Sequence, residues 1–152
     1  MSTFSTLTTG EVNKLKSVAK LAKVAIVVED AADLTAEMAA QIAATGLVIL
    51  IGVPAFENES DMTNNVVAGI EQNILVRECP PIWRNDDTLP HCQDVAQVVA
   101  QSLQGLTVQG FQRIRVVRGE PLGNVRPDPK REISFQDYRL ELKTRLSLQP
   151  IT

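Results

Sequence analysis

The sequence is poor in the side chains from which most active sites and metal sites are built. Its 152 residues include one histidine, two cysteines and six aromatic residues. One histidine and two separated cysteines do not supply the four ligands of a structural zinc site. Neither a P-loop nor a GxGxxG motif is present, so the usual nucleotide-binding loops are excluded. The few aromatics also argue against single-stranded nucleic-acid binding, which relies on stacking.

Long hydrophobic runs are missing as well. The longest, Leu47–Val53, is about a third of what a membrane-spanning helix needs, so we expect a buried strand there and no membrane contact. The first six residues lack a basic segment followed by an apolar one, so we expect no secretory signal. Cys79 and Cys92 are thirteen residues apart and form no CxxC pair, which favours reduced, small apolar side chains over a disulfide framework.

The composition that remains is that of one globular domain covering residues 1–152, with 44% hydrophobic and 22% charged residues. The net charge is −3, which argues against a protein that coats DNA. Residues 1–111 carry a net −7 and residues 112–152 a net +4. Two interpretations are open: basic strand faces that are simply solvated, or a basic edge that meets the acidic edge of another copy. Head-to-tail contacts of the second kind generate rings.

Hydrophobic periodicity predicts helices over residues 9–22, 33–44 and 89–104, and strands over 24–28, 47–53, 66–77, 111–118 and 134–148. Thr8 and Glu11 have the spacing of a capping box, so residues 1–8 are expected to be a flexible N-terminus and residues 54–65 a polar loop. We therefore expect an α+β fold. Its twisted, mixed and largely antiparallel sheet has about five strands, with two to three helices packed mainly on one face.

The last two strands are separated by residues 119–132, a loop far longer than a hairpin needs. Its three prolines and its positive charge favour a stiff docking arm over slack chain. Trp83 is interpreted most simply as a packing residue, with an interface anchor as the alternative. The candidate residues for a subunit or partner interface are Arg113, Arg115, Arg118, Arg126, Lys130, Arg131 and Trp83.

His91 and Cys92, close to Asp86 and Asp87 in the sequence, are side chains of the types found in hydrolytic and thiol active sites. Adjacent helical residues point about 100° apart, so His91 cannot act as a base toward Cys92. Cys92 also begins the apolar face of the helix predicted over residues 89–104. Two acids before a helix complement its dipole, which explains Asp86 and Asp87 without a metal. We therefore predict no catalytic residues, no metal and no cofactor, and keep a hydrolase as the alternative to be tested.

The order of elements resembles that of the tail terminator family of tailed phages, together with related minor tail and neck proteins. The resemblance covers roughly residues 20–148. It rests on the step from strand 47–53 through a loop into strand 66–77, on the helix that ends at Leu103-Gln104-Gly105, and on the closing strands Phe111–Arg118 and Tyr138–Leu146. The family has no signature motif and no catalytic residues.

This resemblance implies a structural virion protein that forms a ring, expected to be hexameric, on the end of the tail tube and joins it to the neck or head. The implied partners are further copies of this chain, the tail tube protein, neck or connector proteins, and the sheath in a contractile tail. DNA is met only in transit through the channel. The implied location is the virion tail or neck, after synthesis in the cytoplasm of a bacterial host. The alternatives are a small non-enzymatic adaptor, another head–tail connector, or the cap of a phage-tail-like injection system.

Overall fold

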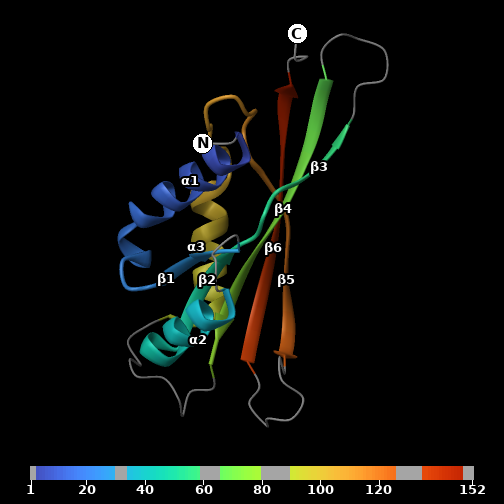
Figure 1. The fold of residues 1–152 in the computed structure, drawn as a ribbon. Helices are drawn as coiled ribbons and strands as arrows, with labels where there is room; N and C mark the ends of the chain where they lie inside the picture. Colours follow the sequence, from blue (N-terminus) through green and yellow to red (C-terminus); the bar gives the residue numbers. More distant parts are fainter. Residues whose placement is uncertain (1–2, 30–33, 59–65, 80–89, 126–134, 149–152) are drawn as a thin grey trace.

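The computed structural model describes residues 3–29, 34–58, 66–79, 90–125 and 135–148. Its elements in chain order are α1 (Thr3–Lys16), a 3-10 turn η1 (Ala19–Leu21), β1 (Ala25–Val28), α2 (Leu34–Thr45), β2 (Leu47–Ile51), β3 (Ala55–Asn58), β4 (Val66–Glu78), α3 (Cys92–Leu103), β5 (Arg115–Val125) and β6 (Phe135–Leu148). The helices lie beside one mixed sheet whose long central strands extend past them (Figure 1). The predicted α+β fold is confirmed.

The sheet has the strand order β1-β2-β4-β6-β5, and β3 pairs with β4 beyond the end of β2. Only β1 and β2 are parallel, joined through α2, and every other pair is antiparallel. β4 and β6 pair along their whole length, from Val66 opposite Leu148 to Glu78 opposite Gln136. The N-terminal strand β1 and the late strand β5 therefore form opposite edges of the sheet (Figure 1).

The main core lies between the sheet and the helices α1 and α3. Side chains of α3 that repeat at helical spacing are buried: Cys92, Val95, Ala96, Val99 and Leu103. They meet one face of the long strands, where Ile70, Ile74, Leu140 and Leu142 are buried by the period-two alternation of a strand. Helix α2 contacts β1 and β2. Most of the helical surface thus packs on one face, as predicted.

Helix α1 is displaced from its predicted position by one to two turns. It begins at Thr3 and ends at Lys16, so residues 3–8, expected to be flexible, are helical. Leu7 and Leu15 are both buried, and they extend the inward-facing stripe toward the N-terminus. Thr8 lies inside the helix, where its hydroxyl donates to the Phe4 carbonyl oxygen at 3.1 Å. The predicted capping box is therefore wrong.

Two further differences concern strands. Residues 55–58, predicted as part of a loop, form β3 against β4, which gives the sheet six strands. Residues 115–125 form β5, so the expected loop over 119–132 is a strand as far as Val125. Register shifts at Val116/Arg118 and Pro121/Gly123 interrupt its pairing with β6. Proline and bulges are tolerated at a sheet edge, because the outward N–H groups need no partner there.

Candidate docking surface

The sheet has an open face, which we define as the side of β4, β6 and β5 opposite to α3. Alternation places charged residues there because the intervening residues face the core. Across the three strands the face carries Glu71, Arg77, Arg115, Arg118, Glu120, Asp137, Arg139, Glu141, Lys143 and Arg145. Both signs are present, so much of this charge is neutralised within the subunit.

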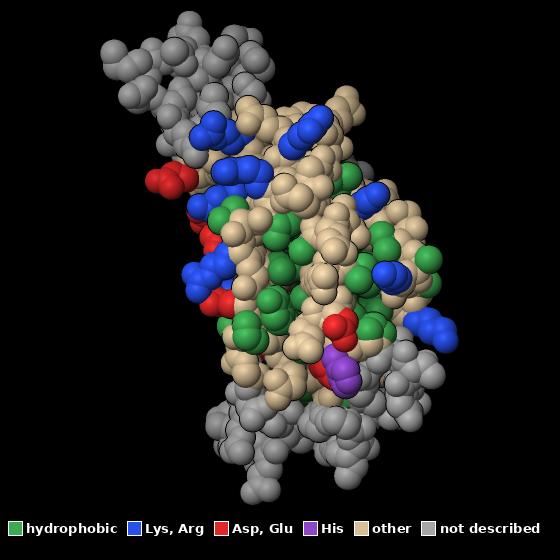
Figure 2. Space-filling model, turned by 180° about the vertical axis from the view of Figure 1, so that it is seen from behind, with side chains coloured by type: hydrophobic (Ala, Val, Ile, Leu, Met, Phe, Trp, Pro, Cys, Tyr) green, Lys and Arg blue, Asp and Glu red, His purple; other side chains and the backbone are tan. Residues whose placement is uncertain are grey.

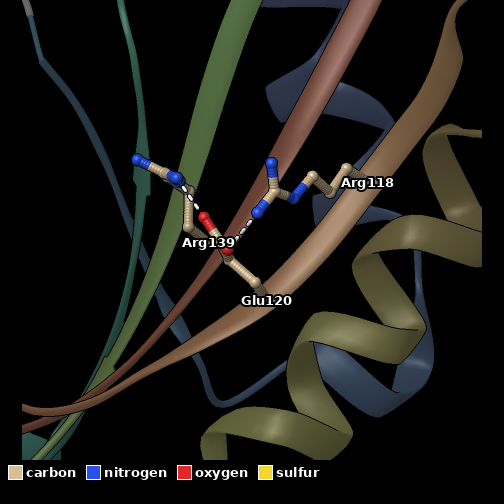
Figure 3. A network of polar contacts seen from close by, with 3 residues as sticks. All are labelled: Arg118, Glu120 and Arg139. Atoms are coloured by element: carbon tan, nitrogen blue, oxygen red, sulfur yellow. Dashed lines mark hydrogen bonds and ion pairs between the residues drawn. The ribbon is translucent and has the colours of Figure 1, made fainter.

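Glu120 of β5 is the centre of one neutralised group (Figure 3). Its carboxylate accepts a hydrogen bond from Arg118 Nη2 at 2.6 Å and another from Arg139 of β6. The hydrogen bond from Arg139, aided by the positive charge of both guanidinium groups, lowers the pKa of Glu120. Arg118, a predicted interface residue, is thus paired within its own subunit.

Asp137 of β6 forms a second pair, in which its own carboxylate is buried and Arg77 is partly buried. Arg77 Nε and Nη2 donate to its two carboxylate oxygens at 2.9 and 2.8 Å, a bidentate arrangement. The Arg77 guanidinium also lies over the Phe135 ring, 5.2 Å from its centroid. The pair locks β4 to β6 near the end of the sheet where β6 begins.

A groove of about 740 Å³ lies where β5 begins, and most of its charged lining residues are cations: Arg113, Arg115, Lys143 and Arg145. Two acids, Glu57 and Glu71, also line it. Lys143 Nζ lies 3.4 Å from the Glu71 carboxylate, an exposed ion pair. Among the residues that the structure describes, no ion pair involves Arg113 or Arg115. Seen from behind, Lys and Arg side chains gather toward one end of the molecule (Figure 2).

The structure brings Arg113, Arg115 and Arg118 to the same edge of the sheet. The remaining predicted interface residues, Trp83, Arg126, Lys130 and Arg131, lie outside the described residues, as do Asp86 and Asp87. Sequence reasoning missed Lys143 and Arg145 as part of the groove. Their alternation with Leu142 and Leu146 pointed to a wet strand face but did not show which strand lies beside them.

The candidate thiol site is a structural helix start. Glu78 of β4 is buried and accepts hydrogen bonds from the Cys92 backbone N–H at 2.9 Å and from His91 Nδ1 at 2.7 Å. A carboxylate in this position satisfies a free amide and complements the helix dipole. Burial, together with the nearby Glu78 carboxylate, raises the pKa of the Cys92 thiol to about 11, so it is not a ready nucleophile.

Glu11 of α1 is the most unusual titratable group in the described chain. It is fully buried between α1 and the sheet, and neither carboxylate oxygen has a hydrogen-bond partner. Burial raises its pKa to about 7, an increase that the side chain of Gln72 partly offsets. The amide of Gln72 also donates to the Gly52 carbonyl oxygen at 2.9 Å. The sequence pattern indicates a capping residue at Glu11, so it does not predict that this side chain is buried.

Two further features are absent from the described residues. They contain no group of three or more His, Cys, Asp and Glu side chains placed to hold a metal ion. No helix among them is long and apolar enough to cross a membrane.

Comparison with known proteins gives a structural match. No protein-family model matches the sequence, and no curated protein sequence matches it. The fold is similar to that of a solved chain from the virion of a native gene transfer agent particle, with 14% sequence identity and a TM-score of 0.62. The match covers 97% of this chain and 100% of that one. Over nearly its whole length, the protein therefore has the fold of a virion chain.

Proposed function

We propose that this protein is a structural component of a phage-like particle, and that it forms a ring at the end of a tail tube and joins the tube to the neck. The observation that carries the proposal is the end-to-end likeness to a virion chain of a gene transfer agent. Because each chain covers almost all of the other, the shared unit is the whole domain. The hexameric ring and the place at the tube end follow the tail terminator resemblance of the sequence.

The arrangement of charge supports a ring. A closed ring of identical subunits needs two different surfaces that fit each other, one on each side of the subunit. The sheet order puts β1 and β5 on opposite sides, and the basic residues gather at β5 and β6. A subunit with unlike edges suits head-to-tail closure better than a two-fold dimer, whose interface uses the same patch twice.

The side chains that suggested chemistry support a structural role. His91 and Glu78 hold the start of α3, and Cys92 is part of the core with a raised pKa. We propose that the protein is not an enzyme. The hydrolase alternative can be tested without an assay of activity, because it requires His91 for function. His91→Ala is expected to leave particle assembly unchanged, measured as the yield of tailed particles by electron microscopy. Loss of that yield from a folded variant would speak for a role beyond the helix start.

The proposal is tested by mass. Mass photometry of the purified protein, alone and after addition of tail tube from the same genome, distinguishes one 16.6 kDa chain from a ring of six. We expect a ring in solution or on tube ends, seen by electron microscopy as a cap on one end of each tube. Tube incubated with buffer is the control. A strict monomer at high concentration that leaves tube ends bare would reject the ring, and capture of one unrelated protein would favour an adaptor.

A further inference from the structure

The groove at the start of β5 and the surface around β1 and α2 carry net charge of opposite sign. Between Lys23 and Arg77 the sequence has no lysine or arginine, and it has eight Asp and Glu residues. Two of the eight, Glu57 of β3 and Glu71 of β4, line the groove described above. The same stretch includes β1, α2 and β2, which lie on the β1 side of β4. Glu29, after β1, and Glu37, on α2, are exposed there. We call this surface the acidic flank.

The groove at the start of β5 is an unfavourable arrangement in a lone subunit. Arg115 lies directly opposite Lys143 in the β5–β6 register, and like charges in that position repel. Glu71, the neighbour of Lys143 on β4, compensates one of them across 3.4 Å. Arg113 adds a further positive charge to the same lining. An acidic surface placed in the groove would relieve this repulsion.

The cations of the open face outside the groove are neutralised by neighbouring carboxylates, so they add no uncompensated positive charge. Arg118 and Arg139 share the Glu120 carboxylate, and Arg77 is held by Asp137. The uncompensated charge is therefore local to the groove. Its position on β5 and β6, at the far side of the sheet from β1, separates it from the acidic flank of the same subunit.

We infer that the groove lined by Arg113 and Arg115 is the docking surface for the acidic flank of a second copy of this chain, including Glu29 and Glu37. The inference rests on the proposed ring and specifies which surfaces close it. Charge complementarity argues for a copy of this chain, because the same molecule supplies both the basic groove and a flank without cations. Nucleic-acid phosphate is the other anion that a cationic groove binds, and the experiment distinguishes the two.

Reciprocal charge reversal tests this contact. The first variant is Arg113→Glu with Arg115→Glu, and the second is Glu29→Lys with Glu37→Lys. Each alone has two edges of the same sign, so its self-association should weaken by more than about tenfold. An equimolar mixture should assemble again, with the two variants alternating around an even-numbered ring. Mass photometry and native mass spectrometry measure the size and the composition of the assembly.

Matched controls separate this contact from general charge effects. Lys16→Glu with Lys23→Glu changes the charge as much as the first variant, at exposed positions away from the groove, and should leave assembly unchanged. Circular dichroism checks that each variant folds. Because Glu29 also accepts a hydrogen bond from the Val53 N–H at 3.3 Å, Glu37→Lys alone replaces the second variant if the double variant does not fold.

The outcomes distinguish this inference from the proposed function. If both variants assemble or cap tail tubes as wild type does, or if their mixture fails to recover, the contact is wrong and the ring proposal stands. If the first variant assembles normally but loses affinity for a fluorescent single-stranded DNA, the groove serves nucleic acid and the contact is wrong. If wild type neither self-associates nor caps tubes, both fail together.

Discussion

At the scale of single residues, Glu11 has the environment that suits its side chain least. A carboxylate placed without hydrogen-bond partners in a core is expensive to ionise, so the folded protein holds a proton there up to a pH near 7. The unfolded chain loses that proton near pH 4.5. Between these values the folded state binds more protons than the unfolded state, and stability therefore falls as pH rises.

Glu11→Gln is predicted to stabilise the protein at high pH only. The gain should reach about 3 kcal/mol at pH 8, given a pKa displaced from 4.5 to about 7, and vanish at pH 4, where the carboxyl is protonated in both states. Urea unfolding at the two pH values measures the difference. Glu37→Gln, at an exposed position, is the control and should show no such pH dependence. An equal effect of Glu11→Gln at both pH values would contradict the assignment.

Asp137 and Glu120 offer a contrast between buried and exposed ion pairs. Asp137→Ala leaves Arg77 without its bidentate partner inside the sheet and should cost about 3 kcal/mol of unfolding free energy. Glu120→Ala breaks the ion pairs with Arg118 and Arg139, which are exposed to solvent. The loss of unfolding free energy should therefore be far smaller. Thermal or urea unfolding compares them. Similar losses would mean that the Glu120 group is as important to the fold as the buried pair.

At the scale of elements, Gly52 joins β2 to the chain that leads into β3. Its N–H donates to the Asn73 carbonyl oxygen at 2.9 Å, and a Cβ at Gly52 would lie 2.4 Å from that oxygen. We predict that Gly52→Ala forces the two strands apart and costs about 1 to 3 kcal/mol. Val53→Ala, at the exposed neighbouring position, is the control. An unchanged urea midpoint for Gly52→Ala would show that the strands adjust freely.

The segment between β5 and β6 is predicted from the sequence to be a docking arm, and that prediction can be tested by mutation. Charge reversal of Arg126, Lys130 and Arg131 is expected to weaken assembly while leaving the fold intact. Mass photometry reports assembly, and circular dichroism reports the fold. Assembly equal to that of wild type would remove the idea of a docking arm.

Elements with a clean period were predictable from the sequence, and those with mixed signals were not. Tyr138, Leu140, Leu142 and Leu146 alternate with charges, and β6 begins and ends within a residue of its prediction. Helix α1 was misplaced because its threonine-rich start has the appearance of a cap, whereas Leu7 carries the buried stripe. β3 was missed because an exposed edge strand does not need the apolar alternation that marks a buried one.

The docking surface was predicted only in part for a related reason. Arg113, Arg115 and Arg118 were recognised as one basic group, but pairing across strands decides which of them is neutralised. Glu120 lies two residues from Arg118 and opposite Arg139, a neighbour that only the β5–β6 register reveals. Without that register, paired and unpaired cations look alike in the sequence.

At the scale of the whole molecule, the separation of charge predicts a dependence of assembly on salt. Contacts between exposed charges are screened as ionic strength rises, because the Debye length falls from about 10 Å at 0.1 M to about 3 Å at 1 M. Assembly of the free protein should weaken from 0.05 to 0.5 M NaCl, measured by mass photometry. Lys16→Glu with Lys23→Glu should show the wild-type slope, and a salt-independent assembly would point to an apolar interface.

The irregular outer edge of β5 affects whether other chains can add to the sheet. A long, straight edge strand invites other chains to add to it, and sheets joined in this way grow into fibres. Two register shifts and Pro121 interrupt β5, and Gly123 has φ +70°. The edge therefore offers no continuous row of amide groups to another polypeptide chain. The β5 edge is therefore a poor template for strand addition by other chains, even at high protein concentration.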